Sequence, residues 1–78
     1  MTIEQIKTEV QALVWEEIGG EQPINPSDRL DNLGLDSLSF MELMLSVQNH
    51  FAVEISDLEI ATIDTVADLE CLLTAKLA

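Results

Sequence analysis

The sequence predicts an all-α fold, a four-helix bundle in which a long loop joins the first two helices and the third helix is short. Three features predict it. Apolar residues recur at helical spacing in three segments, capping signals mark helix starts, and no stretch alternates polar and apolar residues as a strand does. The 78 residues suffice for one domain, residues 1–78, with a small core.

The first helix is expected to begin after Thr2. Thr2 and Gln5 have the spacing of a capping box, and Gly19-Gly20 ends the helical pattern. Trp15, at the edge of the apolar stripe, is expected to pack against the loop that follows. The stripe consists of Ile3, Ile6, Val10, Leu13, Val14 and Ile18.

A long loop is expected from Gly19 to Asp36. It contains Pro23, Pro26 and Gly34, and its apolar residues are irregularly spaced. Those apolar residues should anchor the loop to the core: Ile24, Leu30, Leu33 and Leu35.

Three more helices follow this loop. The second spans Ser37 to Phe51. Ser56 and Glu59 form a capping box for a short helix near residues 57–61, and Thr65 with Asp68 opens the last helix. The apolar face of the last helix consists of Val66, Leu69, Leu72, Leu73 and Leu77.

The second helix is apolar on two sides. One stripe is the expected core face and consists of Phe40, Leu43, Met44, Val47 and Phe51. Leu38, Met41 and Leu45 form a second stripe, for which the other helices offer little room. We expect this second stripe to be a docking surface for partner proteins; packing beneath the long loop is the alternative.

Charge and cysteine content exclude several functions. Fifteen Asp and Glu against three Lys and Arg give a net charge of -12, which disfavours nucleic acid and anionic membranes as partners. The single cysteine, Cys71, excludes an internal disulfide, and the Asp28 to Asp36 stretch lacks calcium-loop spacing, so no metal site is expected. With neither a signal peptide nor a membrane-spanning run, we expect a cytoplasmic protein. We also expect it to be a monomer.

Ser37 stands where the loop becomes the second helix. The residue pattern makes it either the N-cap or a first-turn residue behind an Asp36 cap. A catalytic role is disfavoured, because the only histidine, His50, lies thirteen residues along the same helix, about 20 Å away. A phosphate attached to Ser37 would be favoured by the positive end of the helix dipole.

The segment from Leu30 to Leu38, LDNLGLDSL, followed by Met41-Glu42-Leu43 and Phe51, closely resembles the attachment motif and recognition helix of stand-alone acyl carrier proteins. The resemblance extends over the whole chain. It implies a non-catalytic carrier in which Ser37, with Asp36 beside it, receives 4'-phosphopantetheine from coenzyme A. It further implies that Leu38, Met41, Glu42 and Leu45 form the surface that partner enzymes recognise.

The partners implied are a phosphopantetheinyl transferase and enzymes that load and process acyl groups carried as thioesters. Glu42 is the only acidic residue on the second helix, whereas fatty-acid carriers usually have several there. A polyketide or other specialised pathway is therefore expected, with an aminoacyl or peptidyl carrier and a fatty-acid carrier as alternatives. An unmodified helical interaction module is the alternative from another class.

Overall fold

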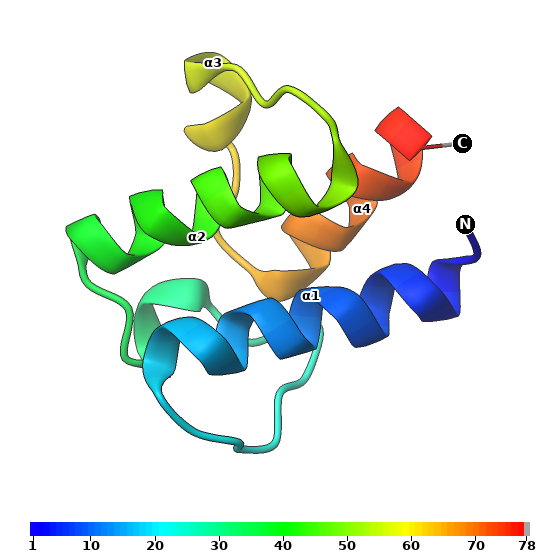
Figure 1. Ribbon diagram of the computed structural model, residues 1–78. Coiled ribbons are helices and arrows are strands. Elements are labelled where there is room, and N and C mark those ends of the chain that lie inside the picture. Colours follow the sequence, from blue (N-terminus) through cyan, green and yellow to red (C-terminus); the bar gives the residue numbers. More distant parts are fainter. Residues whose placement is uncertain (78) are drawn as a thin grey trace.

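The computed structural model describes residues 1–77 and contains four α-helices and one 3-10 helix (Figure 1). In order they are α1 (Ile3–Ile18), η1 (Leu30–Leu33), α2 (Ser37–Phe51), α3 (Asp57–Ile60) and α4 (Val66–Leu77). Helices α1 and α2 run antiparallel, and α1 contacts both α2 and α4. The predicted all-α, four-helix fold with a short third helix is confirmed.

The helix ends lie where the capping signals placed them. The Thr2 hydroxyl accepts a hydrogen bond of 3.1 Å from the Gln5 backbone N–H, and the Gln5 side chain accepts one of 2.8 Å from the Thr2 N–H. Gly19 then ends α1 in the left-handed conformation, with φ 78°. Helix α3 ends at Ile60, one residue earlier than predicted.

The long loop is more ordered than its sequence indicates, because it contains η1 and pairs with the segment before α4. The backbone N–H of Leu30 donates to the Asp64 carbonyl at 2.9 Å, and the Val66 N–H donates to the Asp28 carbonyl at 3.0 Å. These bonds flank an antiparallel bridge between Arg29 and Thr65. The partners are far apart in sequence, so helical periodicity carries no signal for them.

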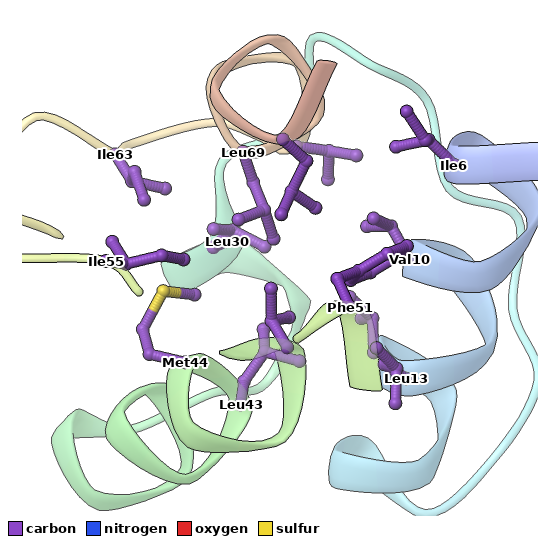
Figure 2. Close-up of a cluster of buried hydrophobic side chains, with 14 of the residues drawn as sticks. Ile6, Val10, Leu13, Leu30, Leu43, Met44, Phe51, Ile55, Ile63 and Leu69 are labelled. Atoms are coloured by element: carbon purple, nitrogen blue, oxygen red, sulfur yellow. The ribbon is translucent and has the colours of Figure 1, made fainter. Parts of the chain in front are cut away.

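One hydrophobic core joins α1, α2, α4 and the loops (Figure 2). Among residues 1–77 no polar or charged side chain is buried. The long loop is anchored as predicted, since Leu30 and Leu35 are buried and Ile24 and Leu33 pack against the core. Trp15 contacts the same loop, because its indole N–H donates to the Gln22 carbonyl at 2.8 Å. The buried residues of α2 are Leu43, Met44, Val47 and Phe51, and Phe40 is partly buried.

Helix α3 has no fully buried residue; Ile60 packs against the core, and polar contacts on both sides also hold the helix. The side-chain carbonyl of Gln48 on α2 accepts a hydrogen bond of 3.1 Å from the Ile55 N–H, just before α3. The ammonium of Lys76 on α4 lies 3.0 Å from a carboxylate oxygen of Glu59. A four-residue helix is thus fixed by ties to both neighbouring helices.

His50 is exposed at the end of α2 and contacts α1. Its Nε2 lies 2.6 Å from Oε1 of Glu9 and so ties the C-terminal half of α2 to α1. The contact depends on helix packing, which brings residues of two distant segments together.

Candidate functional site

Ser37 is the first residue of α2, and Asp36 is its N-cap. The carboxylate of Asp36 accepts a hydrogen bond of 2.8 Å from the Ser39 backbone N–H. The two capping arrangements left open by the sequence are thereby resolved. Since Asp36 supplies the capping acceptor, the exposed hydroxyl of Ser37 is not needed for that role.

The electrostatics at this helix start suit a phosphate on Ser37. The N-terminal end of an α-helix carries a partial positive charge and N–H groups that favour anions. The Ser39 N–H holds the pKa of Asp36 below its ordinary value, with a further contribution from Leu38. Asp36 is therefore ionised at neutral pH, and its carboxylate occupies the N–H of Ser39 that a phosphate would otherwise contact.

An open recess of about 500 Å³ adjoins Ser37. Its walls come from α2, from the segment just before it and from Asp31 of η1. The apolar part of the wall includes buried Leu35, partly buried Phe40 and half-exposed Met41. The lining residues are Asp31, Leu35, Asp36, Ser37, Phe40 and Met41.

The second apolar stripe of α2 is exposed to solvent. Leu38 is 69% exposed, Met41 44% and Leu45 59%, while Leu43 and Met44 of the same helix are fully buried. Packing of the stripe beneath the long loop, the alternative reading, is therefore wrong. The loop instead directs its own apolar residues into the core.

Glu42 lies beside this stripe on the exposed surface and near the end of α1. Partial burial, followed by the nearby Glu42 carboxylate, raises the pKa of Glu17 on α1. The neighbouring carboxylate of Glu16 acts in the same direction. Sequence reasoning did not identify Glu17 as part of this surface, because only the packing of α1 on α2 brings the two carboxyl groups together.

Other reactive side chains lie outside this group. His50 pairs with Glu9 and does not join Ser37. Cys71 is a free, exposed thiol on α4. No group of three or more potential metal ligands occurs within residues 1–77. Over the same range, no helix is both long and apolar enough to cross a membrane.

Comparison with known proteins assigns the segment around Ser37 to a family. The sequence profile of the phosphopantetheine attachment site matches residues 8–73, which is most of the chain. An acyl carrier protein of Exiguobacterium sibiricum is 38% identical over 71 residues, which cover 88% of this chain and 90% of that protein.

Solved structures show the same fold. The crystal structure of an acyl carrier protein from Thermotoga maritima superposes with a TM-score of 0.83 at 25% identity, covering 96% of this chain and 89% of that one. A putative acyl carrier protein from Mycobacterium tuberculosis gives a TM-score of 0.85 at 23% identity, covering 94% and 99% of the two chains. The latter similarity is one of fold alone.

Proposed function

Because this chain belongs to the acyl carrier protein family, whose members are non-catalytic carriers with a phosphopantetheine attachment site, we propose that Ser37 is the attachment residue. The observation that carries the proposal is the position of Ser37. It is exposed at the first turn of α2, within the matched segment. Its hydroxyl is not used for capping, because Asp36 is the N-cap. When bound, the group supplies a terminal thiol that holds an acyl chain as a thioester.

The residues around Ser37 fit that group. The start of α2 favours the phosphodiester electrostatically. Exposure of the hydroxyl leaves it accessible to a transferase, and the adjoining recess leaves space beside the attachment point. We expect Asp36, which is ionised and next in sequence, to contact the transferase during attachment.

We further propose that Leu38, Met41 and Leu45, with Glu42, form the surface that partner enzymes bind. Exposed apolar residues grouped on one helix are typical of interaction sites. Methionine adapts its shape to different partners. The partners are a phosphopantetheinyl transferase and enzymes that load and process acyl groups. A cytoplasmic setting fits the single free thiol, Cys71.

For the pathway, we propose polyketide or other specialised biosynthesis. The support is the single acidic residue on α2, Glu42, in a chain with fifteen acidic residues. An α2 with few acids would discriminate against enzymes that recognise a row of glutamates. Loading with aminoacyl groups would test the aminoacyl alternative, and offering the malonyl-loaded chain to condensing enzymes of polyketide and of fatty-acid synthesis would distinguish those two pathways.

The attachment residue is tested by intact-protein mass spectrometry. The chain is incubated with coenzyme A, magnesium and a promiscuous phosphopantetheinyl transferase, beside the variants Ser37→Ala and Ser39→Ala. Wild type and Ser39→Ala should gain the mass of one phosphopantetheine, and Ser37→Ala should gain none. A wild type without added mass, or a Ser37→Ala variant modified equally well, would refute the proposal. An unmodified wild type would favour the interaction-module alternative.

A further inference from the structure

The recess beside Ser37 has an apolar side that the attachment reaction does not use. Phe40 and Met41 follow Ser37 by three and four residues, so the three side chains lie on one face of the first turns of α2. Leu35, which precedes the helix, completes the apolar wall. A group attached to the Ser37 hydroxyl therefore starts at the edge of this wall.

The charged side of the recess selects which part of such a group can enter. Asp31 and Asp36 both line it. The Arg29 guanidinium holds Asp31 through two contacts of 3.2 Å, and the Ser39 N–H holds Asp36. The start of α2 attracts the phosphodiester, whereas the two carboxylates keep this anion out of the recess and at its solvent side. The uncharged part of the arm that follows the phosphate meets no such repulsion.

We propose that this recess binds the pantoyl segment of the arm, with its two geminal methyl groups against Phe40 and Met41. The inference rests on the proposed attachment at Ser37. Tethering makes the contact intramolecular and gives the pantoyl segment a high effective concentration at the recess, so a small apolar surface suffices to hold it. Met41 also belongs to the docking stripe. A partner seated on that stripe and the arm in the recess therefore compete for one side chain.

NMR spectroscopy of the arm-bearing protein tests this. The arm is installed from coenzyme A carrying 13C-labelled geminal methyl groups, and mass spectrometry first verifies complete attachment. Nuclear Overhauser effects should join these methyls to the Phe40 ring and to the Met41 methyl. Their resonances should also be displaced from those of free pantetheine. Phe40→Leu should abolish the ring-current part of this displacement.

Matched variants separate the recess from the rest of the stripe. Met41→Ser should reduce the Overhauser effects to Phe40, whereas Leu45→Ser, exposed on the same helix but outside the recess lining, should leave them unchanged. Complete attachment with methyl resonances at free-pantetheine positions, or equal losses in both variants, would overturn the recess inference alone. Absence of attachment in wild type would overturn the proposed function and this inference together.

Discussion

Two leucines of α2, separated by a single residue, should differ strongly in how much stability the protein loses when each is truncated. Leu43 is fully buried and Leu45 is 59% exposed. Leu43→Ala removes side-chain volume from the core, which should lower the free energy of unfolding by about 2–5 kcal/mol. Leu45→Ala removes little contact, so its effect should stay within about 0.5 kcal/mol. Both exchanges change helix propensity equally, so the difference between them reports burial.

The magnitude is large for so small a chain. In a domain of this size the core supplies about 3–5 kcal/mol, so Leu43→Ala removes a large part or all of the stability. Even a loss of 2 kcal/mol corresponds to a fall in Tm of about 8–16 °C, against about 2–4 °C for Leu45→Ala at the limit of its range.

Thermal and urea denaturation followed by circular dichroism at 222 nm measures both variants against wild type. The same proteins can be offered to the phosphopantetheinyl transferase below their melting temperatures. We expect Leu45→Ala to melt like wild type while its modification by the transferase slows. Equal losses of stability in the two variants would show that the exposed stripe packs inside the fold in solution, and the docking surface would have to be abandoned.

Two further outcomes follow from the backbone and the titrating groups. Ala52 ends α2 with φ 55°, so Ala52→Gly should relieve about 1 kcal/mol of strain and raise Tm by about 4–8 °C. Ala61→Gly, at φ -64°, should instead lower Tm. A lower Tm for both variants in calorimetry would contradict this. Urea denaturation from pH 8 to pH 3 should show a stability maximum. Because the pKa of Glu17 is raised, its ionisation opposes folding, and stability rises as the pH falls through that folded-state pKa. Because the pKa of Asp36 is lowered, its contribution is present above its unfolded value and is lost as the pH falls from about 4 through its folded-state pKa. Glu17→Gln should flatten the neutral side of the curve and Asp36→Asn the acid side; unchanged curves would refute the assignment.

The helices were predictable because their determinants are local. Capping boxes at Thr2 and Ser56 and the glycine after Ile18 act over three or four residues. The apolar stripes of α1, α2 and α4 repeat within each segment, so periodicity identified most of their buried residues, although Ile3 at the start of the α1 stripe is 55% exposed. The position of Ser37 at the start of α2 could be predicted for the same reason.

Local patterns left other features undetermined. Whether the stripe of Leu38, Met41 and Leu45 is covered depends on where the long loop runs. That path is set by the pairing of residues 28–30 with residues 64–66, which no short-range signal encodes.

The same division holds at the candidate site. Hydrophobic spacing and capping chemistry, which act between near neighbours, were enough to predict four helices and a serine at the start of one of them. The nearness of Glu17 to Glu42 and the pairing of His50 with Glu9 arise only when distant segments pack. Their physical reason is tertiary burial, which brings together side chains that the sequence keeps far apart.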